Sequence, residues 1–295
     1  MEAARTRNRT GERIKALLHR IRQALGRGPF RRSLTAPIPE GFEFFAHVQR
    51  LERRAERETD QALKAAGKRA PKTYEQLGTV LLNLDCVASC FWQCRKEDHL
   101  EERLLGRVVS AVRAAFLLMT SAYYDEALAS LRNAGEAVNL LFLFERDPAS
   151  LQEWKAAEGF ERWNKFKPSK VRKRLAEGGG IVPLEEDWYG QLSRISTHVD
   201  PGTTPQAHNL IGVPTLGGYF QIEGALLVLN EIARVAGLAT FPAARLILED
   251  KNRKLQVLEA GKVLLEEAGS FNLESVEEYR KQQLEALRKQ PRPEK

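Results

Sequence analysis

The chain has 295 residues, of which 43% are hydrophobic and 29% are charged. This composition excludes a collagen-like chain, a disulfide-dense secreted scaffold and a wholly disordered chain. No run approaches the roughly 20 apolar residues of a membrane-spanning helix, so we expect no transmembrane segment. The formal net charge of +7 is uneven, because residues 1–35 hold ten Arg or Lys against two acids and carry +8, which leaves −1 for residues 36–295.

The N-terminal segment 1–35 is predicted to be a basic amphipathic arm and linker. Its apolar residues recur at helical steps, with basic side chains largely around them: Ile14, Leu17, Leu18, Ile21 and Leu25. Such an arm could dock onto a protein partner or an anionic surface, and a helix lying on a membrane is the alternative. The segment lacks the apolar run and cleavage site of a secretory signal, so we expect a cytoplasmic protein.

Helical periodicity continues through the rest of the chain. Residues 36–71 contain one long charged helix at 40–66, residues 72–240 form the predicted helical core, and residues 241–295 form charged peripheral helices at 242–268 and 273–290. Within the core, caps and apolar repeats predict helices that start at Thr73, Asp98 and Asp147-Pro148 or span 125–146, 184–198 and 218–238. The predicted fold class is all-α: a helical bundle with long charged peripheral helices and a basic N-terminal arm.

The chain has three cysteines: Cys86, Cys90 and Cys94. A small, odd number of cysteines does not indicate a disulfide framework and fits a reducing compartment. On one helix, Cys86 and Cys94 would lie about 12 Å apart along the axis. That separation is too large for one shared ion, although His99 follows. We therefore expect small buried apolar side chains here, with no metal and no cofactor.

A strip at residues 162–174 holds seven basic residues and no acid. Basic side chains neutralise phosphates, and interleaved aromatic rings stack unpaired bases. The strip therefore predicts binding of single-stranded nucleic acid, unless it is a solvated helix face balanced by the acids of residues 145–161. The predicted nucleic-acid-binding residues are Arg162, Trp163, Lys165, Phe166, Lys167, Lys170, Arg172, Lys173 and Arg174.

A second cluster lies near the end of the helix predicted at 184–198. Arg194 and His198 are four residues apart and so share a helix face. His198 could act as an acid or base while Arg194 stabilises a phosphorane-like charge, with the 2′-hydroxyl of RNA as the internal nucleophile. The alternatives are a helix-terminal cap under a polar loop, or an iron site made of His198, Asp200 and His208.

Further polar residues are predicted to support this site. Arg132 and Glu136 form a pair four residues apart, and Asn139 continues along the same, otherwise apolar helix. Such a pair is more often structural or interfacial than catalytic, but it could line a polar groove. The supporting set is completed by Ser193, Asp200 and His208.

Leu131-Arg132, Glu136 and Leu140-Leu141 on one helix, followed by Leu192-Ser193 and His198 on a later one, resemble the HEPN-like helical domains over about residues 80–240. The resemblance implies a metal-independent RNase, often a toxin or an antiphage effector, that acts as a dimer pooling two Arg–His pairs. The match falls on Arg194 and His198, which have three residues between them where the family has four to six. Many relatives lack the pair and serve as binding modules.

Two functions therefore follow from the sequence. The first is a HEPN-like, homodimeric RNA-cutting protein of phage defence or stress response, with Arg194 and His198 as catalytic residues. The second is a non-catalytic helical interaction module that binds nucleic acid, or a protein partner through residues 1–35.

Overall fold

The computed structural model describes residues 43–65, 69–93, 98–179, 182–198, 203–209 and 212–268. The arm predicted at 1–35, the helix predicted at 273–290, Cys94 and Asp200 lie outside these residues. By its internal contacts the chain divides into two units, Met1–Gln49 and Arg50–Lys295. Both candidate sites below belong to the second unit.

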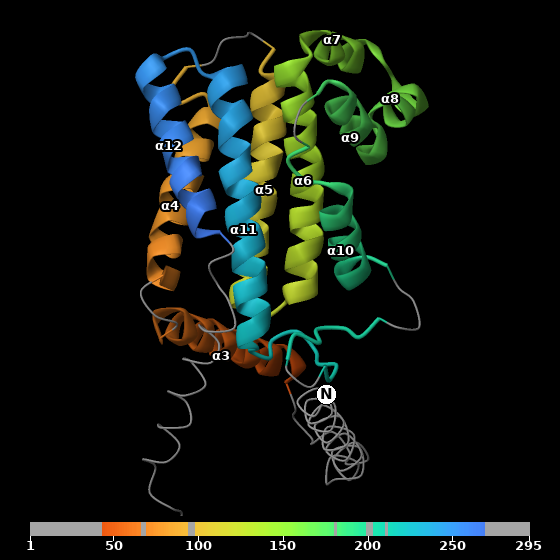
Figure 1. Ribbon diagram of the computed structural model, residues 1–295. Coiled ribbons are helices and arrows are strands. Elements are labelled where there is room, and N and C mark those ends of the chain that lie inside the picture. The colour runs from red at the N-terminus through yellow and green to blue at the C-terminus, as the bar shows by residue number, and fades with distance from the viewer. Residues whose placement is uncertain are drawn as a thin grey trace, which may run out of the picture. The chain divides into compact units, whose positions relative to one another are not determined.

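Ten α-helices and one π-helical turn form the regular structure of the described residues, which contain no β-strand (Figure 1). The all-α prediction is confirmed. The elements are α3 (Phe44–Ala65), α4 (Arg69–Ala88), α5 (Leu100–Thr120), α6 (Tyr124–Arg146), α7 (Pro148–Ala156), α8 (Gly159–Phe166), α9 (Pro168–Glu177), α10 (Glu186–Ser196), α11 (Ile222–Pro242), η1 (Ala243–Ile247) and α12 (Lys251–Glu267).

The helix α11 lies at the centre of the bundle, in contact with α4, α5, α6 and α12 (Figure 1). It is apolar nearly all round, as a helix surrounded by others must be. Val228, Leu229 and Ile232 have no exposed surface. By length and composition alone the stretch Ile222–Ile247 could also cross a membrane, but 67% of its apolar window is buried inside the fold. Burial against the neighbouring helices accounts for its apolar sequence.

The helix α10 approaches α6 at a glycine. A Cβ atom on Gly135 would come within 2.6 Å of Trp188 Cη2 and 2.9 Å of Leu184 Cδ1. Trp188 is 5% exposed, and its indole N–H donates a hydrogen bond of 2.5 Å to Glu231 Oε2 on α11. Because Gly135 has no Cβ atom, the indole ring of Trp188 can pack between α6 and α11.

One of the predicted helix starts is confirmed and two are wrong. Asp147 caps α7, because its side chain accepts a hydrogen bond of 3.1 Å from the Ala149 N–H and Pro148 is the first helical residue. Thr73 lies inside α4, where it is fully buried. Asp98 forms an ion pair with Lys155 of α7 and provides no cap, and α5 starts after His99, whose φ of 50° is left-handed.

The prediction that the cysteines are buried side chains on one helix is also wrong for Cys86 and Cys90, the two that the structure describes. Because α4 ends at Ala88, Cys86 lies on the helix, whereas Cys90 follows it in a turn with a φ of 57°. Both side chains are half-buried, not fully buried. The turn brings Cys90 Sγ to 3.3 Å from His99 Nδ1, near the start of α5.

Substitution of Gly135 by Ala should lower the free energy of unfolding by about 1–3 kcal/mol, because the new methyl group collides with a buried ring that cannot move freely. Gly78 is the matched control, since a Cβ there would meet no atom within 4 Å. Gly78→Ala should raise the stability by about 0.5–1 kcal/mol. Urea unfolding measures both values, and equal effects of the two substitutions would contradict the packing described for α6 and α10.

Candidate functional site

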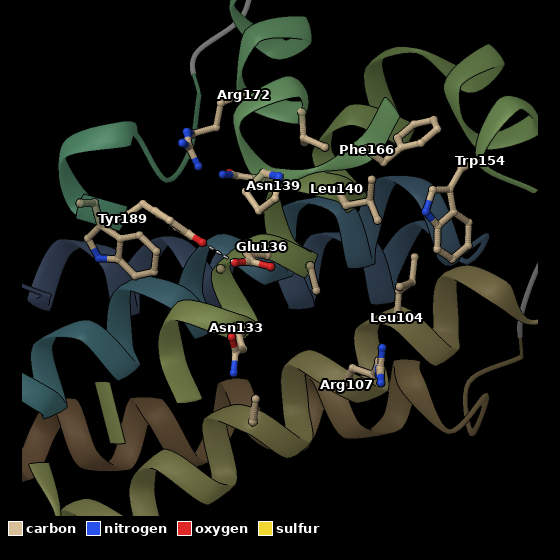
Figure 2. Close-up of a pocket in the computed structure, with 17 residues that line it drawn as sticks. Leu104, Arg107, Asn133, Glu136, Asn139, Leu140, Trp154, Phe166, Arg172 and Tyr189 are labelled. Carbon is tan, nitrogen blue, oxygen red and sulfur yellow. Dashed lines mark hydrogen bonds between the residues drawn. The ribbon is translucent and has the colours of Figure 1, made fainter. Parts of the chain in front are cut away.

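A pocket of about 490 Å³ opens between α5, α6, α9 and α10 (Figure 2). This volume lies within the range of small-molecule and cofactor sites. Apolar side chains such as Leu104, Leu140 and Phe166 form part of its wall. The polar and charged groups that line it are those of Arg107, Asn133, Glu136, Asn139, Arg172 and Tyr189.

Arg132 joins α6 to α10 at the edge of this pocket. Its Nε donates a hydrogen bond of 2.9 Å to the Ser193 hydroxyl, and its guanidinium lies 4.1 Å from the centre of the Tyr189 ring. The Tyr189 hydroxyl in turn donates a hydrogen bond of 2.8 Å to Glu136 Oε1, as Figure 2 shows. Arg132 Nη1 is 3.4 Å from the same carboxylate oxygen. These contacts fix the orientation of Tyr189 and Glu136.

Two further arginines give the pocket its positive charge. Arg172 of α9 lies over the Tyr189 ring at 4.8 Å, and Arg107 of α5 is exposed. Among the described residues, neither of these two arginines forms an ion pair within 4.0 Å, whereas Arg132 forms one with Glu136. Arg132 and Arg172 therefore act on the single carboxylate of the pocket, and Arg107 adds a positive charge at another part of its wall.

Burial raises the pKa of the Glu136 carboxyl above its ordinary value, although the positive charges of Arg132 and Arg172 act in the opposite direction. A carboxyl whose pKa is perturbed by burial and specific charges, in a concave pocket, is typical of functional sites. Because the guanidinium fork matches the geometry of phosphate and carboxylate groups, the pocket is suited to a phosphate-bearing ligand.

Asn139 has a structural role beneath the pocket. Its side-chain amide donates a hydrogen bond of 2.8 Å to the Leu184 carbonyl and accepts one of 3.2 Å from the Leu184 N–H. Asn139 is 5% exposed. The pair of bonds holds the segment before α10 against α6, so the residue positions the site and its amide is already occupied.

The predicted basic strip is divided between α8 and α9 at Lys167. Phe166 is 9% exposed and cannot stack a base, whereas Trp163 is 59% exposed and packs against Phe160, with ring centres 5.5 Å apart. Arg162 donates a hydrogen bond of 3.1 Å to the Trp154 carbonyl.

Acids neutralise part of this strip, as the alternative interpretation of the sequence expected. Lys165 pairs with Glu153 and Glu161, Arg174 with Asp147 and Glu153, and Lys173 with Glu177. No ion pair of Lys167, Lys170 or Arg172 occurs within the described ranges. The positive charge that remains lies at the N-terminal turns of α9, beside the pocket.

Arg194 and His198 are both exposed at the C-terminal end of α10. The helix ends at Ser196, and the His198 backbone N–H donates to the Ser193 carbonyl at 2.8 Å. Neither side chain lines the pocket. The expectation that both residues share a face of one helix is therefore wrong, because only Arg194 lies on α10 and His198 follows its end. Both side chains are open to solvent.

His208 belongs to a different cluster from His198. Its Nε2 is 2.7 Å from Asp125 Oδ1, and the other oxygen of Asp125 accepts a hydrogen bond of 2.8 Å from the Gln206 backbone N–H. Gln221 donates to the Gln206 carbonyl at 2.7 Å. These bonds fasten the loop before α11 to the start of α6, so His208 is occupied by a structural partner.

Three polar residues of the pocket, Arg107, Asn133 and Tyr189, were not among those predicted from the sequence. Tyr189 precedes Ser193 by four residues on the same helix, so the helical spacing offered a signal for it. Arg107 offered none, because it joins the wall of the pocket only in the folded chain. Comparison of the chain with known proteins finds no matching family model, curated protein or solved structure. The site therefore rests on its own geometry.

The raised pKa of Glu136 predicts an unusual pH dependence. Its protonated form is favoured by folding, so wild-type stability is lost as the pH rises from 4.5 through the folded-state pKa. Glu136→Gln mimics the protonated form at every pH. Its stability relative to wild type should therefore increase as the pH rises from 4.5 through the folded-state pKa of Glu136. Urea unfolding at several pH values measures the difference.

Glu153 is the control, because its pKa is shifted in the opposite direction from that of Glu136. The hydrogen bond from Arg174 lowers the pKa of Glu153, so its contribution to stability is present above 4.5 and is lost as the pH falls through the folded-state pKa. Glu153→Gln should be less stable than wild type at neutral pH, with a difference that disappears in acid. The same pH trend for both variants would contradict the assignment.

Proposed function

We propose that this protein binds single-stranded RNA, with a phosphate group in the pocket between α5, α6, α9 and α10. The observation that carries the proposal is that Arg107 and Arg172 line the pocket and form no ion pair within 4.0 Å among the described residues. A guanidinium group binds phosphate through two parallel hydrogen bonds. Arg132 adds a third positive charge next to Glu136, the single carboxyl group among the residues that line the pocket.

The surface beside the pocket supports a chain of nucleotides as the ligand. Arg172 belongs both to the pocket and to α9, whose Lys170 is exposed. On α8, Phe160 and Trp163 are 76% and 59% exposed. Stacking of one base on an aromatic ring is worth about 1–3 kcal/mol, irrespective of the base. Phosphate contacts at α9 and stacking at α8 together suit an unpaired strand.

Cleavage of the bound RNA is the second candidate function, favoured by the exposure of Arg194 near the end of α10 and of His198 two residues beyond it. In this reaction the 2′-oxygen attacks the adjacent phosphorus while His198 accepts its proton. Arg194 stabilises the charge on the phosphorane, and the proton passes to the 5′-oxygen as its bond to phosphorus breaks. The products are a 2′,3′-cyclic phosphate and a 5′-hydroxyl. The resemblance to HEPN-like domains adds a homodimer to this proposal.

RNA binding should weaken in Arg107→Ala and in Arg172→Ala. Each loss of a phosphate contact should also reduce the slope of log affinity against log salt by about 0.7. Fluorescence anisotropy of a labelled oligouridine over a range of salt concentrations measures both quantities.

Lys262→Ala on α12 is the control, because this exposed lysine does not line the pocket. Arg107 is exposed, so its substitution should leave the circular dichroism spectrum unchanged even if Arg172→Ala perturbs the packing on Tyr189. An unchanged salt slope in Arg107→Ala, or no binding of oligouridine by the wild type, would reject the pocket as an RNA site.

Cleavage is tested separately with end-labelled RNAs of varied sequence in the presence of EDTA. Wild type should produce fragments ending in a cyclic phosphate, and His198→Ala should lose this activity while it retains RNA binding. Since both sites of substitution are exposed, Arg194→Ala should also fold normally. Intact RNA after incubation with wild type would reject the cleavage step and leave the binding proposal standing.

A further inference from the structure

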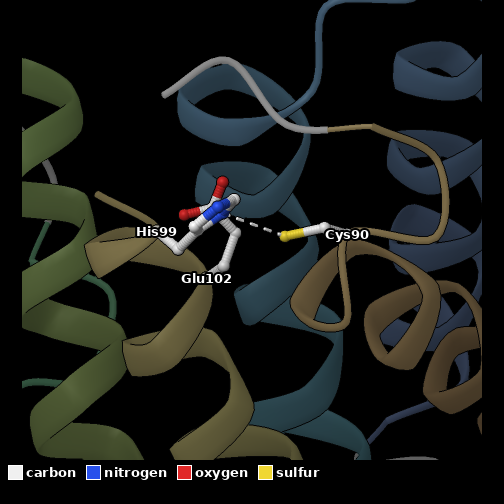
Figure 3. A group of neighbouring side chains, drawn as sticks. All are labelled: Cys90, His99 and Glu102. Atoms are coloured by element: carbon white, nitrogen blue, oxygen red, sulfur yellow. Dashed lines mark hydrogen bonds between the residues drawn. The ribbon is translucent and has the colours of Figure 1, made fainter. Parts of the chain in front are cut away.

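Three potential metal ligands meet where the chain passes from α4 to α5. Cys90 Sγ is 3.3 Å from His99 Nδ1, and both atoms lie within 4.8 Å of a carboxylate oxygen of Glu102. Figure 3 shows Cys90 pointing from the turn after α4 toward His99 and Glu102 at the start of α5. None of the three lines the pocket proposed for RNA.

The carboxylate of Glu102 is the decisive observation. Glu102 is 3% exposed, and its Oε2 is buried without a hydrogen-bond partner. A buried carboxylate oxygen without a partner is energetically unfavourable unless a proton or a cation compensates it. Among the described residues, the potential ligands within reach of this carboxylate are a thiol and an imidazole, so one metal ion could contact all three groups at once.

The spacing of the donor atoms fits zinc. With bonds of about 2.3 Å to sulfur and about 2.1 Å to nitrogen at a tetrahedral angle, a shared zinc ion places these two atoms about 3.6 Å apart. The separation of 3.3 Å between Cys90 Sγ and His99 Nδ1 is close to this value. The other two pairs of donor atoms lie within 4.8 Å of each other, so each would have to shorten by at most about one ångström to share a zinc ion.

The charges of the ligands also balance those of zinc. A thiolate and a carboxylate each contribute one negative charge, and a neutral imidazole contributes none, so a divalent ion makes the group neutral. Neutrality matters because an uncompensated charge is expensive in a buried environment. The sulfur and nitrogen donors favour zinc over magnesium or calcium, which prefer oxygen ligands.

We propose that Cys90, His99 and Glu102 bind one zinc ion that joins the end of α4 to the start of α5. A fourth position is left for water or another donor. The ion would hold Cys90 and His99 in their left-handed backbone conformations, with φ values of 57° and 50°. It acts on stability by binding the folded chain in preference to the unfolded one.

The test uses the full chain, stripped of metal and titrated with Co²⁺ as a spectroscopic probe and then with Zn²⁺. Wild type should bind one ion, with the thiolate-to-cobalt absorption in the near ultraviolet and the visible bands of a tetrahedral site. Zinc should displace cobalt and raise the melting temperature. Absence of the thiolate band in wild type would overturn the proposal.

Cys90→Ser should abolish the thiolate band, whereas Cys86→Ser, one turn earlier on α4 and outside the group, should retain it. Cys94 stays unchanged in every variant. Glu102→Gln keeps both other donors and should retain the band with at least about tenfold weaker affinity. His198→Ala is the control for His99→Ala, because His198 is exposed and remote in sequence.

Circular dichroism of each metal-free variant separates loss of binding from loss of folding. If Cys90→Ser fails to fold, Glu102→Gln decides the question, since its amide preserves size and hydrogen-bonding capacity. An unchanged cobalt spectrum and affinity in Glu102→Gln, or a zinc-dependent melting temperature in a folded Cys90→Ser, would overturn the assignment of these ligands.

Discussion

The close approach of α10 to α6 at Gly135 is the constraint on which the candidate site depends. It allows the Trp188 ring to lie between α6 and α11, where the indole binds Glu231. One residue further along α10, Tyr189 then reaches Glu136, and one turn later Ser193 reaches Arg132. A side chain at position 135 would displace the helix that carries all of these contacts. The pocket is therefore a consequence of packing at one small residue.

The positive charge of α8, α9 and the pocket is uneven, because only some of the basic side chains form ion pairs with acids. Asp147 before α7, Glu153 on α7 and Glu161 on α8 neutralise Lys165 and Arg174. The seven basic residues of the strip therefore do not act as one surface. What remains is the start of α9 together with the pocket, where burial opposes ionisation of the single carboxyl group. Net charge over the whole chain predicts none of this. The positive region arises because some cations have acidic neighbours in space and others do not.

Local features of the fold were predictable from the sequence, and long-range ones were not. The predicted helix at 125–146 is observed as α6 from Tyr124 to Arg146, and the Asp147 cap is confirmed, because both depend on periodicity and on neighbouring residues. The bond from Arg132 to Ser193 joins residues 61 apart, and the pair of Asp125 and His208 joins residues 83 apart. Periodicity carries no information on such contacts. The prediction from the cysteine spacing failed because it took Cys86 and Cys90 to lie on one continuous helix. In the structure α4 ends at Ala88, and the turn that follows directs Cys90 toward α5.

Two regions of the molecule thus differ in their chemistry: an arginine-lined pocket on one side of α6, and a group of potential metal ligands where α4 meets α5. The central claim is that the pocket holds a phosphate of RNA. A crystal structure of the full chain with a short oligouridine tests this most directly. We expect a phosphate group of the bound strand within hydrogen-bond distance of Arg107 or of Arg172, and a base stacked on Trp163. RNA bound on another face, with the pocket empty of phosphate, would contradict the claim.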